Sequence, residues 1–293
     1  MEALARAASG IDLDRELRQS RPLRHCHGLE IHSLHGDAFP TVMHEIGRLR
    51  EMVFRVVGAG RGDRVDLDVL DSGPRAYRQL IAWDPEHQEL VAMYRYQRGN
   101  QVQGDADLRT AGLFDYTEAF RERVLPCGIE LGRSVVNPQA ARRRLGFHAI
   151  WHGLGALLGQ YPETRFFFGN VSLYESLPRE ARSLIVAFLE RHYAPPEDLL
   201  CARAGLRYRP DSPAAVPDRL PETPRERIRA LRDLLAPTDT PVPPILQSYL
   251  SLGTRIWFGE TAHDEDFGNA LEIGIIVPVA EIDPAIQDRF IRG

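Results

Sequence analysis

Apolar residues recur at helical spacing in three parts of this chain. One stripe covers residues 41–57, a second follows residue 146, and a third runs over residues 178–193. The first begins after Pro40, where we expect Thr41 to cap the helix. Three amphipathic helices are therefore predicted, and the first two have these apolar faces: Val42, Ile46, Leu49, Val53 and Val57; and Phe147, Ile150, Trp151, Leu154, Leu157 and Leu158.

Strand patterns lie between these helices. Residues 77–83 and 90–96 indicate two strands joined by a tight turn at residues 84–87, which is typical of a hairpin. Residues 129–136 form a short apolar run, and residues 166–168 are strand-like. The order helix, strand, strand, strand, helix, strand, helix predicts an α/β fold in which helices flank a mixed, mostly antiparallel sheet.

Composition divides the chain into four expected segments. Eleven of its 21 prolines fall between residues 195 and 244, which marks a connecting region. Within it Thr223 and Glu226 have the spacing of a capping box, so a short helix is predicted over residues 223–235. The segments are an N-terminal segment 1–40, a core domain 41–194, the Pro-rich region 195–244, and a C-terminal extension 245–293 that packs on the core.

Charge and cysteine content narrow the function classes. The 293 residues include 36 Lys and Arg against 41 Asp and Glu, a formal charge of −5 that argues against a general nucleic-acid binder. Three widely spaced cysteines, Cys26, Cys127 and Cys201, fit a reduced cytoplasmic protein better than a disulfide scaffold. No signal-peptide pattern or run of about 18 apolar residues is present, so contact with the inner membrane face would be peripheral.

The predicted strand at residues 129–136 carries an acid and a base. In a regular strand Glu130 and Ser134 face one side, whereas Arg133 and Val135 face the other. Both charges need partners if the strand is buried, and Gly132 between them would let a ligand approach closely. The stretch indicates either an internal ion pair or an active site. Glu130 and Arg133 can enter one pocket only if the strand is irregular there.

Two loops add candidate binding groups. Asp66, Asp68 and Asp71 form either a solvated turn or a site for a cationic amine. The loop 137–146 is rich in arginine and precedes a helix, whose first backbone N–H groups are unpaired. This loop is therefore able to hold a phosphate.

Other local motifs favour structural interpretations. The glycine-rich residues 58–62 follow a helix and lack nucleotide-loop spacing, so we interpret them as a turn. His32 and Asp37 have the H-x-x-x-x-D spacing of glycerolipid acyltransferases, without that family's further motifs. One cluster contains residue types that bind metals: His25, Cys26, His27, His32 and His35. No metal site is predicted there, because the cluster lacks recognisable ligand spacing.

An ordered set of short motifs resembles the hemolysin-like N-acyltransferases of the GNAT superfamily, relatives of the ornithine-lipid and glycine-lipid synthases and, more distantly, of the acyl-homoserine-lactone synthases. The similarity covers nearly the whole chain. The motifs that carry it are Glu45-Ile46-Gly47-Arg48-Leu49-Arg50-Glu51, Phe54-Arg55, Asp66-Leu67-Asp68, Tyr94-Arg95-Tyr96, Glu130-Leu131-Gly132-Arg133-Ser134, Trp151-His152-Gly153-Leu154-Gly155, Phe168-Gly169-Asn170-Val171-Ser172, Tyr249-Leu250-Ser251-Leu252-Gly253 and Phe267-Gly268-Asn269-Ala270-Leu271-Glu272.

The resemblance implies a GNAT fold and transfer of a long-chain fatty acyl group from acyl carrier protein, or from coenzyme A, to the amine of an amino acid. The product would be an N-acyl amino acid, a lyso-aminolipid, and no cofactor would be bound permanently. One departure concerns the donor. Loop 137–146 has only Gly146 where ordinary GNAT acetyltransferases have (Q/R)-x-x-G-x-(G/A). Arginines here would suit the single phosphate and the acidic surface of a carrier protein.

Roles follow for the matching residues. Glu130 would act as base, Arg133 would orient it or bind a carboxylate, and Ser134 would protonate the leaving thiolate. The expected acceptor and acyl-chain contacts are Arg50, Phe54, Asp66, Asp68, Arg95, Trp151, Phe168 and Asn170. The expected donor contacts are Val135, Val136, Arg142, Arg143, Arg144 and Gly146.

Three alternatives stay open. An acyl-homoserine-lactone-type synthase would use S-adenosylmethionine and release a lactone. A non-catalytic GNAT-fold module would bind a carrier protein or a membrane without turnover. A glycerolipid acyltransferase using His32 and Asp37 is the third alternative.

Overall fold

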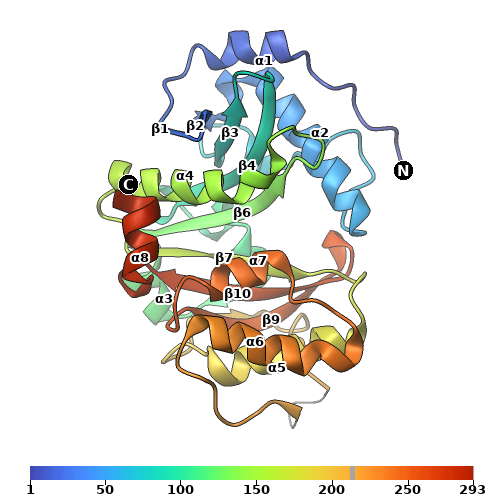
Figure 1. Cartoon of the computed structure of the whole chain (residues 1–293), viewed down its shortest axis with the longest axis vertical. Helices are drawn as coiled ribbons and strands as arrows, with labels where there is room; N and C mark the ends of the chain where they lie inside the picture. Colours follow the sequence, from blue (N-terminus) through green and yellow to red (C-terminus); the bar gives the residue numbers. More distant parts are fainter. Residues whose placement is uncertain (212–214, 293) are drawn as a thin grey trace. The chain divides into compact units, whose positions relative to one another are not determined.

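The computed structural model describes residues 1–211 and 215–292, and the chain forms two compact units (Figure 1). Each unit combines segments that are distant in the sequence. Unit 1 comprises Met1–Leu108, Glu130–Glu163 and Gln287–Gly293, and unit 2 comprises Arg109–Ile129 and Thr164–Ile286. The four segments expected from composition describe the order along the chain and stay a prediction.

Unit 1 is a sheet with helices packed against it. Neighbouring strands follow the order β1-β2-β3-β4-β6, and the β1-β2, β2-β3 and β3-β4 pairs are antiparallel. The strands are β1 (Arg24–Cys26), β2 (Leu29–His35), β3 (Arg78–Asp84), β4 (Glu89–Arg98) and β6 (Gly128–Val136). The helices are α1 (Gly10–Leu17), α2 (Pro40–Val56) and α4 (Gly146–Gln160), followed at the chain end by a π-helical turn, Asp288–Arg292.

Helices α2 and α4 contact opposite faces of strand β3. A Cβ atom added to Gly153 of α4 would lie 2.9 Å from Leu80, so the helix lies close to that residue. The preceding residue, Gln79, accepts a hydrogen bond at 2.7 Å from Arg50 of α2. Because neighbouring strand residues point to opposite faces, the sheet lies between the two helices. Polar contacts on the α2 face thus form away from the apolar contacts with α4.

The start of α2 differs from the prediction. Thr41 was expected to cap the helix, but the N-cap is Phe39 and Pro40 occupies the first helical position. The backbone N–H groups of Thr41 and Val42 donate instead to the carboxylate of Glu16, at 3.1 and 2.7 Å. A carboxylate from α1 therefore caps α2, and local sequence cannot reveal such a distant partner.

The described part of unit 2 contains three neighbouring sheet strands, a two-stranded ribbon and several helices, and the first three residues of α8 (Pro284–Gln287) belong to it. The sheet order is β7-β10-β9 with antiparallel pairing, and β5 pairs with β8. Helix α5 packs against β9 and α6, and α6 also contacts α7. The elements are β5 (Phe114–Tyr116), α3 (Glu118–Arg123), β7 (Phe166–Leu173), α5 (Arg179–His192), β8 (Leu200–Ala202), α6 (Pro224–Leu235), α7 (Pro244–Leu250), β9 (Trp257–Asp264) and β10 (Ala270–Pro278).

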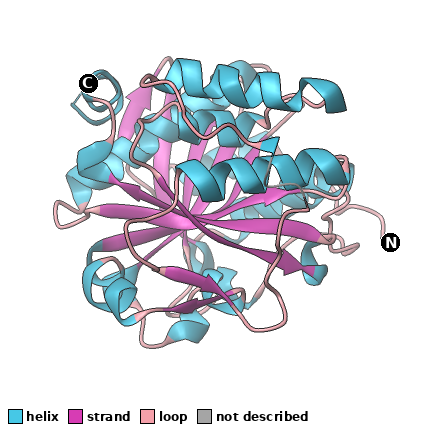
Figure 2. Ribbon diagram, turned by 90° about the horizontal axis from the view of Figure 1, so that it is seen from below, coloured by secondary structure: helices cyan, strands magenta, loops and turns pink. Residues whose placement is uncertain are grey.

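The predicted α/β class is confirmed, since each unit contains both helices and strands (cyan and magenta in Figure 2). The hairpin, the strand at residues 129–136 and the three long helices are present. The side chain of Thr223 caps α6 as predicted, and Pro224 is its first residue. Phe147 is an exception, since it is 38% exposed and does not join the buried face of α4. Among the described residues, no helix is long and apolar enough to span a membrane.

Candidate active site

Charged side chains from α2, β4 and the loop before β3 form a buried network in unit 1. The guanidinium of Arg50 contacts Asp71 at 3.0 Å and donates to Gln79 at 2.7 Å. Arg95 on β4 contacts Asp71 at 3.0 Å and Asp68 at 2.9 Å. Asp71 thus lies between two arginines, and the expected residues Arg50, Asp68 and Arg95 are gathered in one place.

The electrostatic environment keeps these carboxylates charged. Burial raises the pKa of Asp68 and of Asp71, but the nearby guanidinium groups lower both pKa values further, so that each lies below its usual range. Burial by itself would lower the pKa of Arg95, yet the two carboxylates raise it. The network therefore supplies fixed charges near neutral pH.

Arg133 and Asp66 extend this network. Arg133 Nε lies 3.0 Å from an oxygen of Asp66, and Arg133 Nη2 lies 3.9 Å from Asp68. The guanidinium also lies 5.3 Å from the ring centroid of Phe54. Asp66 is 1% exposed, and its two carboxylate oxygens accept no hydrogen bond from the described residues. It is therefore a buried anion with unused acceptor capacity.

Glu130 joins the same side of the sheet through an aromatic residue. The hydroxyl of Tyr77 donates a hydrogen bond to the Glu130 carboxylate, and both side chains are buried. The guanidinium of Arg95 lies 4.9 Å from the centroid of the Tyr77 ring. Glu130 is thus connected to the charged network by Tyr77 and Arg95.

Strand β6 has the irregularity that a shared pocket requires. Arg133 has φ of +55°, in the left-handed region that side chains other than glycine seldom adopt. A Cβ atom added to Gly132 would lie 3.8 Å from Arg95, so this position faces the network. The regular alternation of side chains ends at this residue. Glu130 contacts Tyr77, and Arg133 lies near Asp68; both of these partners also contact Arg95.

The network reaches the surface at an open pocket. Asp68 lines this pocket of about 520 Å³ with Arg61, Leu67, Val69 and Ser72. A small polar molecule entering this pocket would reach Asp68.

The expected donor residues surround the start of α4. Val135 is buried, Ser134 and Val136 are half-buried, and a Cβ atom added to Gly146 would lie 2.7 Å from Val136. Helix α4 starts at Gly146 without a side-chain cap, and the N–H of Gly146 donates to the backbone carbonyl of Arg143 in the preceding 3-10 turn.

The three arginines before α4 are not equivalent. Arg142 forms ion pairs with Asp84, at 3.4 Å, and with Glu86. Arg143 and Arg144 are exposed. The last two are thus the better placed to meet a partner from solution.

The remaining expected contacts lie in other surroundings. Trp151 is half-buried on α4, with its ring centroid 6.5 Å from that of Phe290. Phe168 and Asn170 belong to unit 2, where Phe168 packs edge-on against Phe120 at 5.2 Å and Asn170 donates to Glu272. Trp151 therefore belongs to unit 1, whereas Phe168 and Asn170 belong to unit 2. The role of these residues in acyl-chain binding stays a prediction.

Sequence reasoning did not identify two members of the network. Tyr77 and Gln79 are ordinary strand residues in the sequence, and their partners are 53 and 29 positions away in Glu130 and Arg50. His32 and Asp37 do not pair. His32 contacts Ser20 and Glu30, whereas Asp37 accepts from the backbone of Gly73.

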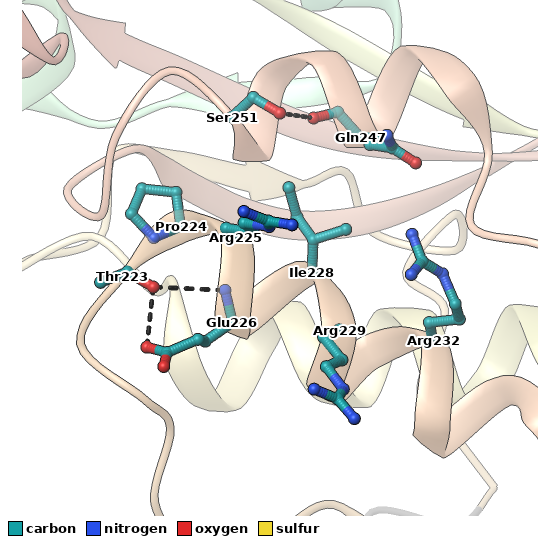
Figure 3. Close-up of a pocket in the computed structure, with 9 residues that line it drawn as sticks. All are labelled: Thr223, Pro224, Arg225, Glu226, Ile228, Arg229, Arg232, Gln247 and Ser251. Atoms are coloured by element: carbon teal, nitrogen blue, oxygen red, sulfur yellow. Dashed lines mark hydrogen bonds between the residues drawn. The ribbon is translucent and has the colours of Figure 1, made fainter.

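A larger groove lies between α6 and α7 in unit 2 (Figure 3). It measures about 980 Å³ and contains none of the expected site residues. Arg225, Arg229 and Arg232 give it a basic lining. Its other residues are Thr223, Pro224, Glu226, Ile228, Gln247 and Ser251.

Known proteins similar to this chain are N-acyltransferases. Residues 49–152 match the family model described as an acetyltransferase (GNAT) domain. The glycine N(alpha)-acyltransferase of Bacteroides thetaiotaomicron is 33% identical over 304 residues, which cover 100% of this chain and 89% of that protein. The protein of the same name from Phocaeicola vulgatus is 32% identical, covering 100% and 92%.

A more distant relative and the solved structures complete the comparison. The L-ornithine N(alpha)-acyltransferase of Brucella abortus is 27% identical over 198 residues, which cover 68% of this chain and 64% of that protein. No solved structure matches the chain significantly. Similarity over the full length shows that the chain belongs to the GNAT-superfamily N-acyltransferases related to the aminolipid synthases, and that it is an acyltransferase.

Proposed function

We propose that this enzyme transfers a long-chain fatty acyl group from a thioester donor to the α-amino group of glycine. The observation that carries the proposal is the buried carboxylate of Asp66, which has unused acceptor capacity and lies 3.0 Å from Arg133. A free amino acid carries an ammonium and a carboxylate. Asp66 offers a negative charge to the ammonium, and Arg133 offers a positive charge to the carboxylate. The names of the two full-length relatives support glycine as the acceptor.

Glu130 is the proposed base. Its carboxylate is buried beside the network and held by the Tyr77 hydroxyl, so it has a defined position. Removal of an ammonium proton frees the amine, which attacks the thioester carbonyl. The new C–N bond forms and the C–S bond breaks. Ser134 is the proposed group that gives a proton to the leaving thiolate and takes in return the second proton lost by the amine nitrogen.

The donor is proposed to be acyl carrier protein in preference to coenzyme A. The arginine-rich loop before α4 would receive the phosphate of a pantetheine arm, and the exposed Arg143 and Arg144 would meet an acidic partner surface. Backbone N–H groups near Val135 and Val136 are the proposed polarising contacts for the thioester carbonyl.

The test is an assay of purified enzyme with acyl carrier protein thioester and glycine. Glu130→Gln removes the base without changing shape, and we expect kcat to fall about 100-fold or more. The Glu122→Gln variant changes an exposed carboxylate and serves as the matched control. Mass spectrometry should detect N-acyl glycine with the wild type and the control.

Other outcomes would change the assignment. Full activity of Glu130→Gln would remove the proposed base. A lactone formed from S-adenosylmethionine would identify an acyl-homoserine-lactone-type synthase. If no amine acceptor yields a product with any donor, the chain is a binding module.

A further inference from the structure

Two histidines and a cysteine gather in unit 1 outside the charged network. Cys26 lies on β1, and His148 and His152 lie one turn apart on α4. Their possible ligand atoms all lie within 4.8 Å of one another. The Sγ atom of Cys26 is 3.6 Å from Nδ1 of His148, and the two imidazole centroids are 4.6 Å apart.

The fold dictates this convergence. Residues four apart on a helix share a face, so His148 and His152 point the same way. Helix α4 packs against β1, which brings Cys26 to that face. The two histidines have the spacing of a helical ligand pair, but Cys26 is 122 positions from His148, so the sequence does not reveal the third ligand.

We propose that Cys26, His148 and His152 bind a divalent transition-metal ion of the Zn²⁺ type. Thiolate sulfur and imidazole nitrogen are the ligands that such ions prefer. Bonds of about 2.3 Å to sulfur and about 2.05 Å to nitrogen, at a tetrahedral angle, hold the two atoms about 3.6 Å apart. The Cys26–His148 distance equals this edge of a zinc tetrahedron.

Phe290 would shield a bound ion, and the charge of a Cys26 thiolate would offset the positive charge of Arg24 and Arg289 nearby. The ring of Phe290 lies edge-on to His148 and His152, with centroids 5.2 and 5.0 Å away. Arg24 donates to the backbone carbonyl of Phe290 at 2.7 Å, which holds that residue in place. A metal here would join β1 to α4 and stabilise unit 1, so its effect would be on folding, separate from acyl transfer.

The test uses the full chain and the metal alone. Apo protein is prepared with a chelator and titrated with Co²⁺, whose tetrahedral thiolate complexes absorb in the near ultraviolet and the visible. We expect a thiolate charge-transfer band that saturates at about one ion per chain, and about one Zn²⁺ per chain by elemental analysis after zinc loading and dialysis.

Matched variants separate this site from adventitious binding. Cys26→Ser and His152→Gln should bind at least tenfold more weakly, whereas Cys127→Ser and Cys201→Ser should bind like the wild type. Zn²⁺ should raise the Tm of the wild type and not that of Cys26→Ser. Circular dichroism checks that the variants fold. The cobalt spectrum of the wild type tests the proposal by itself, so the test does not depend on the folding of a variant. Absence of that band, or equal binding by wild type and a folded Cys26→Ser, would overturn the proposal.

Discussion

Buried carboxylates in this protein differ by whether a guanidinium lies beside them. Asp71 contacts Arg50 and Arg95, and its pKa is lowered. Glu272 is buried to the same degree but receives hydrogen bonds from Asn170 and Ser172, which are neutral. Burial therefore raises the pKa of Glu272 above its usual range. The first carboxylate contributes fixed charge, and the second is stabilised by protonation.

This difference predicts a pH-dependent effect of Glu272→Gln. A raised pKa means that the folded state favours the protonated acid. The contribution of the Glu272 carboxyl to the stability of the folded state is complete below its pKa in the unfolded chain, about 4.3. This contribution is lost as the pH rises through the pKa in the folded state. The neutral glutamine avoids this loss, so the variant should be more stable than wild type at pH 7.5.

Urea unfolding at pH 4.5 and pH 7.5 measures the effect. The stability difference should be small at the lower pH and grow at the higher one. Glu265→Gln, at an exposed position of the same unit, should show no such trend. A Glu272→Gln protein that is less stable than wild type at pH 7.5 would contradict the prediction.

At the scale of elements, strand β6 contains one strained residue, Arg133. A residue other than glycine in the left-handed region costs roughly 1–2 kcal/mol. Arg133 adopts it with φ of +55°, and its guanidinium reaches Asp66 and Asp68 from there. We infer that the ion contacts offset the backbone strain, so conformation and charge at this position are linked.

A pair of substitutions separates backbone strain from charge. Arg133→Gly and Arg133→Ala both remove the guanidinium, but only glycine adopts the left-handed conformation without strain. Arg133→Gly should therefore be about 1 kcal/mol more stable than Arg133→Ala in thermal or urea unfolding. Equal stability would mean that β6 relaxes to a regular strand once the arginine is lost. Both variants should lose activity if Arg133 binds the acceptor.

For the whole molecule, the sequence predicts elements better than their contacts. The hairpin of β3 and β4 was predictable because apolar runs flank a polar turn at residues 84–87. The β1-β2 hairpin was not predicted, because histidines interrupt its apolar residues. Its turn does carry a sequence signal, Gly28. His27 and Gly28 both adopt positive φ, and glycine is common at such turn positions.

The candidate site was predicted in part. Glu130 and Arg133 are predictable as site residues because buried strands seldom carry charge. Their partners Tyr77 and Asp66 come from distant segments, and the pairing of such segments is decided by the whole fold. The metal cluster was missed for the same reason, since Cys26 and His148 are joined only by the packing of α4 on β1.

The choice of donor partner is a property of the whole molecular surface. If an acidic carrier protein docks on Arg143 and Arg144, reversing both charges should weaken its encounter with the enzyme. We expect the Arg143→Glu, Arg144→Glu double variant to raise KM for the carrier-protein donor about tenfold at low salt, with kcat nearly unchanged. High salt should reduce the difference, because exposed charges are screened.

A second basic surface provides the control. Arg229 and Arg232 line the groove on α6, and reversal of both makes an equal change in net charge. That double variant should keep the wild-type KM for the carrier-protein donor. With an uncharged acyl-pantetheine thioester as donor, the KM values of the wild type and the two double variants should differ far less. If the α6 variant has the raised KM, then the carrier protein docks on unit 2. If neither reversal matters at low salt, the donor reaches the enzyme without an acidic protein surface, and a small thioester becomes the better candidate.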